Sequence, residues 1–256
     1  MLTRLLTDSL SLVFGHLETV FKVCGAWFGL QFVLSILLLL STGGQAFDGE
    51  NDVISPATGV LLMVNTILAF VSAASIAVAW HRFGLRGDDV GPIHLRFGLV
   101  ELLFLLKMAV IGIVSSVLLI PMIFVAFIPS DTLMSGVLLV AILAGFFLLF
   151  SLVMRFNLVL PATAVEQPLG FMEAFQMGKG LGWRMLLAII ALSLPLIFVA
   201  LGLQYVLSQF SFGLPALLIQ LKLMVLNVLL QIILTVLGIS VITSAYRMAL
   251  ERAARP

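Results

Sequence analysis

Six long apolar stretches limit what this chain can fold into more than any other feature. Each is close to the roughly 20 apolar residues that a helix needs to cross a bilayer. They are about twice the length of a barrel strand and lack its alternation of apolar and polar residues. The sequence therefore predicts an all-α bundle of six transmembrane helices. The stretches cover residues 26–42, 57–80, 108–128, 133–154, 185–207 and 223–244.

Composition supports a membrane protein. The chain is 62% hydrophobic and 10% charged, whereas ordinary soluble domains carry roughly 25% charged residues. A soluble fold of this composition would expose large apolar patches and aggregate. We therefore expect a single integral membrane domain over residues 1–256, surrounded by membrane lipids. The net charge of +1 gives no global field that would attract nucleic acid, so we expect no nucleic-acid partner.

The basic residues are distributed unevenly. If the six stretches cross the membrane in turn, twelve of the thirteen Lys and Arg side chains lie on one side and only Lys222 lies on the other. The longest loop on the far side, residues 43–56, contains three acidic residues and no basic one. Cytoplasmic loops are enriched in Lys and Arg. This predicts that both termini are cytoplasmic, and the lack of Asn-x-Ser/Thr sequons agrees with a bacterial inner membrane.

A short motif recurs after the second, fourth and sixth stretches. It reads Arg, a large apolar residue, any residue, then Leu, at residues 82–85, 155–158 and 247–250. The recurrence predicts three repeats, and chance similarity remains the alternative because the motif is short. Each repeat would be an in-plane amphipathic cytoplasmic segment followed by a helical hairpin. The repeats cover approximately residues 1–87, 88–165 and 166–256.

The three in-plane segments differ in clarity. In the first, apolar residues recur at steps of three or four between Leu6 and Val20, which predicts a helix lying in the interface plane. The second would begin after Asp88-Asp89 with Pro92 in its first turn. The third, around residues 168–177, is followed by glycines that disfavour a continuous helix.

Arg82, Arg155 and Arg247 close equivalent ends of three predicted spans. If the repeats pack around a pseudo-threefold axis, these guanidinium groups would converge on the cytoplasmic side. A guanidinium group suits phosphate, and basic pockets between spans bind lipid headgroups. The three arginines are therefore candidates for binding an anionic lipid or phosphate. The alternative is that each only obeys the positive-inside rule and reaches toward the interface.

Polar side chains form a second candidate site inside the membrane. Gln220, just before the sixth stretch, and three residues within it are spaced by 7, 4 and 4 residues and so share one helix face. They would form interhelical hydrogen bonds or, alternatively, line a polar pathway with side chains of the second stretch. The candidate residues are Asn65, Ser72, Gln220, Asn227, Gln231 and Thr235.

Lys107 and Lys222 precede two spans, and we expect both to reach the interface. Pro121 and Pro195 fall inside spans and are expected to kink them. Paired interruptions of this kind can also mark transporter sites.

The sequence has few groups that could perform chemistry. Its three histidines have no second ligand type at metal-site spacing. It has no phosphate-binding loop ending in Gly-Lys-Ser or Gly-Lys-Thr and no Gly-x-Ser-x-Gly motif. The single cysteine, Cys24, excludes an intrachain disulfide. We therefore expect no catalytic, metal or cofactor site.

Two segments resemble a bacterial family. Residues 155–166 (RFNLVLPATAVE) are similar to an Arg followed by Leu-Pro-Ala-x-Ala-Val-Glu, and residues 174–184 (AFQMGKGLGWR) to Ser-Trp-x-Leu-Thr-Arg-Gly-Asn-x-Trp-Arg. Residues 80–83 (WHRF) match a further family feature. The family comprises six-span proteins similar to the membrane domain of glycerophosphodiester phosphodiesterases. Ala174, Gly178 and Leu181 replace its usual Ser, Thr and Asn, which puts a polar role for that segment in doubt.

The resemblance implies a membrane bundle without catalytic residues, because phosphodiesterase activity in that family belongs to a separate soluble domain. The sequence therefore predicts a non-catalytic inner-membrane scaffold or accessory protein. Its basic cytoplasmic face would engage anionic lipid or another membrane protein. The alternative is a small-solute or lipid transporter. A water-accessible cavity at Asn65, Asn227 and Gln231 would favour transport, and a dry interface there would favour the scaffold.

Overall fold

The computed structural model describes residues 1–41, 55–126, 132–209 and 215–254, and this part of the chain is helical without strands. Six of its helices are long and apolar enough to cross a membrane. The prediction of an all-α bundle with six spans is therefore confirmed. The helices are α1 (Leu2–Phe14), α2 (Leu17–Ser41), α3 (Pro56–Arg86), α4 (Leu99–Ala126), α5 (Thr132–Phe156), α6 (Val159–Ala164), α7 (Phe171–Met177), α8 (Gly182–Gln209) and α9 (Ala216–Ala253).

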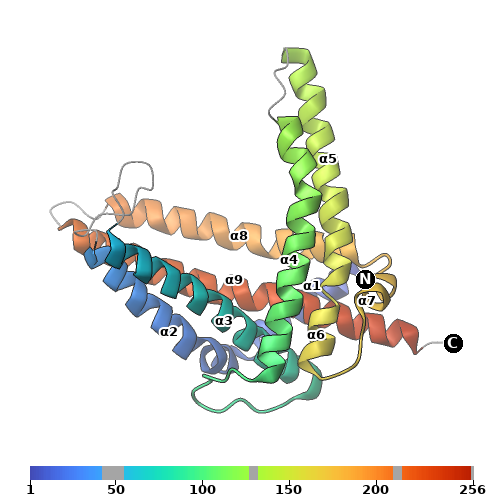
Figure 1. Cartoon of the computed structure of the whole chain (residues 1–256), viewed down its shortest axis with the longest axis horizontal. Helices are drawn as coiled ribbons and strands as arrows, with labels where there is room; N and C mark the ends of the chain where they lie inside the picture. Colours follow the sequence, from blue (N-terminus) through green and yellow to red (C-terminus); the bar gives the residue numbers. More distant parts are fainter. Residues whose placement is uncertain (42–54, 127–131, 210–214, 255–256) are drawn as a thin grey trace.

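The long helices form two groups that meet at one end. Helices α2, α3, α8 and α9 run alongside one another, whereas the α4–α5 hairpin projects away from them (Figure 1). We call the first group the four-helix arm and the hairpin the α4–α5 arm. The short helices α1, α6 and α7 lie where the two arms meet, and we call this region the junction (Figure 1). Each predicted hairpin is present, because α2 packs on α3, α4 on α5 and α8 on α9.

Helix α3 crosses α9 at the junction with very close backbone approach. A Cβ atom on Gly84 would lie 2.9 Å from Cγ2 of Thr243 and 3.2 Å from a methyl carbon of Leu12. One turn earlier in α3, the buried Trp80 donates from Nε1 to Ser240 Oγ at 2.7 Å. The absence of a side chain on Gly84 thus lets α1, α3 and α9 meet at one point.

A hydroxyl relay accompanies this crossing. Ser240 and Thr243 each donate their own hydroxyl hydrogen to a carbonyl of α9 one turn back. Each hydroxyl oxygen then accepts a bond from α3. The Thr243 hydroxyl has already donated its only hydrogen to the Ile239 carbonyl oxygen. Nδ1 of His81 is therefore the donor in the 2.8 Å hydrogen bond to Thr243 Oγ1. Polar groups buried between the helices are satisfied in this way, as an apolar surrounding requires.

Two of the three predicted in-plane segments are helical. The first forms α1, which packs across α9 and α8 at the junction. It ends at Phe14, so the last part of the predicted apolar stripe belongs to α2. The third forms α7, followed by a turn in which Gly180 has a positive φ of 70°.

The prediction of a second in-plane helix after Asp88-Asp89 was wrong. Residues 87–98 are not helical. Gly87, with φ of 73°, ends α3 in the left-handed region, which glycine adopts without strain. Val90 is the one strongly buried apolar side chain of the segment, whereas Ile93, Leu95 and Phe97 are exposed, so tertiary packing of an apolar face gives no support to a helix here. The segment instead runs along α3, where Ser75 Oγ donates to the Arg96 carbonyl oxygen at 2.6 Å.

Packing against α5 requires glycine at Gly178, just after α7, and at Gly182, the first residue of α8. A Cβ on Gly178 would lie 2.9 Å from Cβ of Arg155, and a Cβ on Gly182 would overlap the backbone carbonyl oxygen of Ser151. The backbone cannot move aside easily at such a site, because both helices belong to the packed junction.

Replacing Gly182 with alanine should therefore destabilise the protein by about 1–3 kcal/mol, the usual cost of overpacking. Gly29→Ala is the matched control, because a Cβ at Gly29 meets nothing within 4 Å. That control should be neutral or slightly stabilising, since alanine favours helix more than glycine does. Thermal unfolding of the two detergent-extracted variants checks the prediction. Equal melting temperatures would contradict the close contact with α5.

The segment 87–98 should also loosen in acid because of His94. This side chain is half-buried and its Nε2 atom has no hydrogen-bond partner within the described residues. Burial lowers the pKa of His94 below 6.5, and Arg96 adds to the effect while Glu101 opposes it. The neutral ring is therefore the form that fits the folded segment. The contribution of His94 to the stability of this segment is present above pH 6.5 and is lost as pH falls through the lowered pKa.

We expect hydrogen exchange in residues 87–98 to increase, relative to the rest of the chain, when pH is lowered from about 7.5 to about 5. His94→Gln should remove this pH dependence, because glutamine does not titrate in that range. If the variant showed the same acid response as the parent protein, another group would be responsible.

Candidate functional site

The cationic side chains gather at the junction. Arg82 and Arg86 lie at the end of α3, Arg155 at the end of α5, and Arg247 near the end of α9. These helix ends meet in the same region of the molecule (Figure 1). Lys222, by contrast, is near the start of α9, at the opposite end of the four-helix arm. The sequence predicts that Lys222 lies apart from the other basic residues, and in the structure it lies at the opposite end of the four-helix arm from these arginines.

The three candidate arginines lie in three different surroundings. Arg82 donates from Nε to the Ala164 carbonyl oxygen at 2.8 Å and from Nη2 to Glu166 Oε1 at 2.5 Å. Arg247 donates to the carbonyl oxygen of Gly84. The guanidinium carbon of Arg155 lies 5.1 Å from the ring centre of Phe175. Arg82 and Arg247 are therefore used to tie helix ends together.

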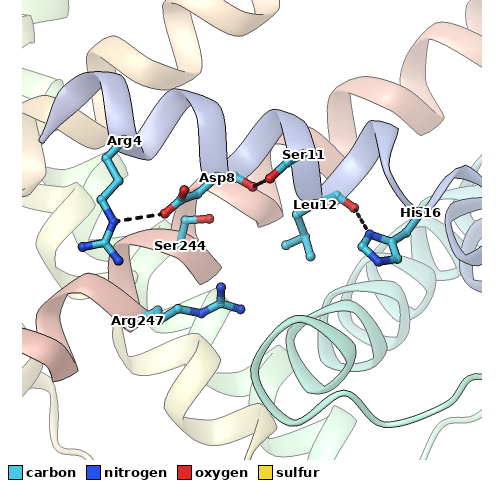
Figure 2. Close-up of a pocket in the computed structure, with 7 residues that line it drawn as sticks. All are labelled: Arg4, Asp8, Ser11, Leu12, His16, Ser244 and Arg247. Atoms are coloured by element: carbon cyan, nitrogen blue, oxygen red, sulfur yellow. Dashed lines mark hydrogen bonds and ion pairs between the residues drawn. The ribbon is translucent and has the colours of Figure 1, made fainter.

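Arg247 lines a polar hollow between α1 and α9, which we call the α1–α9 hollow (Figure 2). It has a volume of about 440 Å³. Arg4, Asp8, Ser11 and Leu12 project from α1 and His16 from the turn after it, while Arg247 and Ser244 approach from α9 (Figure 2). The lining residues are Arg4, Asp8, Ser11, Leu12, His16, Ser244 and Arg247.

The two arginines of this hollow differ in their partners. Arg4 forms a two-bond ion pair with Glu251, both bonds at 2.8 Å, and lies 3.5 Å from Asp8. The hydrogen bonds to Glu251 raise the pKa of Arg4, so its charge is held. Arg247 has no carboxylate within ion-pair distance among the residues described here. Its positive charge is therefore available to a ligand.

His16 closes one end of the hollow (Figure 2). Its Nδ1 lies 3.2 Å from the carbonyl oxygen of Leu12. A carbonyl oxygen only accepts, so Nδ1 carries the hydrogen and Nε2 is left for another partner. Ser11 has a hydroxyl group on the same lining and donates it to the Asp8 carbonyl oxygen.

A second polar hollow lies where α4 begins, and we call it the α4 hollow. It measures about 520 Å³ and contains two arginines, Arg82 and Arg96, and two carboxylates, Glu101 and Glu166. Glu101 accepts a 2.8 Å bond from the backbone nitrogen of Gly98 and so caps the start of α4. The formal charges of the four side chains cancel.

The intramembrane polar residues are divided between two interfaces. Ser72 of α3 accepts a 2.5 Å hydrogen bond from Gln31 of α2. Asn227 of α9 accepts a 3.0 Å bond from Gln204 of α8. Gln231 is exposed, and Asn65, Gln220 and Thr235 are half-buried. Within the described helices, no hydrogen bond joins these residues of α3 to those of α9.

Lys107 has a partner that sequence reasoning missed. It lies inside α4 rather than before it, and its Nζ donates to Thr163 Oγ1 of α6 at 2.9 Å. Thr163 passes its own hydrogen to the Val159 carbonyl oxygen. The only sequence signal was a threonine in an otherwise apolar run, residues 159–164, and nothing in that run indicated that it would face α4.

The hydrogen bond from Arg82 to the Ala164 carbonyl oxygen should contribute more to stability than its ion pair with Glu166. Arg82→Gln removes both, and we expect a loss of about 1–3 kcal/mol, because a buried carbonyl oxygen is left unsatisfied. Glu166→Gln removes only a pair whose carboxylate is largely exposed, and should cost less than about 1 kcal/mol. Thermal unfolding of the two variants checks the order. A larger loss for Glu166→Gln would show that the ion pair dominates.

Among the described residues, no three His, Cys, Asp or Glu side chains are placed so that they could hold a metal ion. No family model matches this chain, and neither a curated protein nor a solved structure is similar enough to count as a match. The resemblance to the membrane domain of glycerophosphodiester phosphodiesterases therefore stays a prediction.

Proposed function

We propose that this integral membrane protein is a non-catalytic scaffold or accessory protein of the bacterial cytoplasmic membrane. Its junction would face the cytoplasm and bind the headgroup of an anionic phospholipid in the α1–α9 hollow. The observation that carries the proposal is the guanidinium group of Arg247, which lines that hollow without a carboxylate partner in the described part of the chain.

The composition of the hollow supports an anionic ligand. Arg4 pairs with Glu251 and Asp8, and the positive charge of Arg247 is the one on the lining that no carboxylate of the described residues pairs. Arg247 is positioned by its bond to the Gly84 carbonyl oxygen, and the planar group has further N–H donors for a phosphate. The hydroxyl groups of Ser11 and Ser244 lie on the same lining. The hydrogen of Ser11 is already donated to the Asp8 carbonyl oxygen, so the planar fork of Arg247 would orient a phosphodiester rather than only attract it.

The surroundings of the hollow support a lipid rather than a free anion. Helix α1 buries Leu5 and Val13 on one face and exposes polar residues such as Thr7 and Ser11 on the other. The apolar face of α1 packs on α8 and α9, so its polar face would lie at the cytoplasmic ends of the spans, which is the level of the headgroups. A hollow under α1 would therefore meet phospholipid phosphates directly. The enrichment of Lys and Arg at the junction favours a cytoplasmic orientation.

A small-solute or lipid transporter is the second candidate. It is favoured by the exposed amide pair Gln204–Asn227 and by Gln231 on the same helix. Amides at membrane depth need polar partners, and water or a solute would supply them. Uptake or flipping by the purified protein in liposomes, lost on Asn227→Leu but kept on Ser11→Asp, would favour this candidate over the scaffold.

An added carboxylate in the α1–α9 hollow should expel the lipid. Ser11→Asp places a negative charge on the lining at an exposed position of α1, where the fold is little affected. We expect retention of phosphatidylglycerol by the purified protein to fall about tenfold, because one favourable charge contact is replaced by repulsion. Native mass spectrometry of the gently extracted protein counts the bound lipids.

Thr7→Asp is the matched control, because Thr7 is exposed on the same helix but does not line the hollow. It should retain the lipid as the parent protein does. Millimolar inorganic phosphate should not displace the lipid, because it has no acyl chains to bury. Equal retention by Ser11→Asp and Thr7→Asp would overturn the proposal.

A further inference from the structure

An apolar groove lies between the two arms. It is formed along α4, with Phe70 of α3 as its opposite side, and its volume is about 560 Å³. The α4–α5 arm diverges from the four-helix arm (Figure 1), and Ile113 and Val117 on the groove are exposed. Its lining is almost entirely hydrocarbon. The residues contributed by α4 include Leu105, Met108, Gly112, Ile113 and Val117.

The groove continues the α4 hollow along one face of the same helix. Glu101 lines the hollow, and Leu105, Met108 and Gly112 line the groove. They follow one another at steps of four, three and four residues, so they form one stripe on α4. From Glu101 to Gly112 the helix rises about 16 Å. This is close to one leaflet of a hydrocarbon core about 30 Å thick.

The α4 hollow has separated charges of both signs. Arg96 is exposed, and no partner for its guanidinium group occurs among the described side chains. Glu166 pairs with Arg82 through Oε1, but its side chain is 59% exposed and its carboxylate stays accessible. A ligand that has a negative group and a positive group a short distance apart would satisfy both ends of this hollow.

We infer that α4 holds one zwitterionic phospholipid with an ethanolamine headgroup, its phosphate on Arg96, its ammonium on Glu166 and an acyl chain in the groove along α4. The site is separate from the α1–α9 hollow, and the inference does not rest on the anionic lipid proposed there. The α4 hollow would determine which lipid headgroup binds. The groove would supply most of the binding energy through burial of the acyl chain.

The primary ammonium distinguishes ethanolamine from other headgroups. It has three N–H donors for a carboxylate, whereas a choline headgroup has the same charge but no N–H group. A glycerol headgroup keeps the phosphate and has no cation to meet Glu166. We therefore expect the order ethanolamine above choline, and choline above glycerol, at this site.

Native mass spectrometry with phospholipids that share the same acyl chains tests the headgroup. The protein should retain the ethanolamine lipid about tenfold better than the choline lipid, the factor for one charge-assisted hydrogen bond. Glu166→Gln should abolish this preference, and Arg96→Gln should weaken both lipids about equally. A wild-type protein without preference for ethanolamine, or a preference that survives Glu166→Gln, would overturn the assignment.

Filling the groove tests the acyl chain. A Cβ at Gly112 or at Gly202 meets nothing within 4 Å, and both glycines are exposed inside long helices. Only Gly112 lines the groove. Gly112→Leu should lower retention of the ethanolamine lipid about tenfold, the factor for roughly two methylene groups lost from burial. Gly202→Leu should leave it unchanged. Equal retention by the two variants would contradict a lipid in this groove.

The two lipid sites can fail independently. Ser11→Asp should leave the ethanolamine lipid in place, and Gly112→Leu should leave phosphatidylglycerol in place. Loss of both lipids in either variant would mean a single shared site and would overturn the assignment of the groove to ethanolamine lipid.

Discussion

The close packing of α3 against α9 at Gly84 is the contact on which the rest of the structure depends. With no side chain at Gly84, the two helices approach until Thr243 is in van der Waals contact, and Leu12 of α1 closes over the same point. The approach brings Trp80 and His81 within hydrogen-bond distance of hydroxyl groups on α9. In lipid, where burial of apolar surface does little to hold helices together, such packing and hydrogen bonding must do so.

The crossing of α3 and α9 also positions arginine side chains. Arg247 reaches the Gly84 carbonyl oxygen because the two helices are so near, and this contact aims its guanidinium group below α1. Arg82 and Arg86 reach in the other direction, to carbonyl oxygens of residues 164 and 165 at the end of α6. The arginines therefore have two uses. They obey the charge asymmetry of a membrane protein, and they satisfy helix-end carbonyl oxygens that would otherwise lack donors.

The spans and their hairpin pairing could be predicted from the sequence because bilayer thickness fixes helix length and short loops pair neighbours. The predicted helix after Asp88-Asp89 failed, because tertiary contacts of the Arg96 backbone outweighed a favourable start at Pro92. The ion pair between Arg4 and Glu251 joins residues 247 positions apart, and no local sequence pattern predicts such a pair. The Lys107–Thr163 bond was missed for the same reason, since its partner lies on a separate short helix.

We propose that the six helices place the arginine-rich junction in the cytoplasm. Labelling of single cysteines in intact cells tests it most directly, in a Cys24→Ser background that removes the one native thiol. An impermeant maleimide should modify Asp48→Cys, which lies in the acidic loop between the first two spans. Arg252→Cys, near the end of α9, should react only after the membrane is opened. Equal reaction at both positions in intact cells would contradict the account.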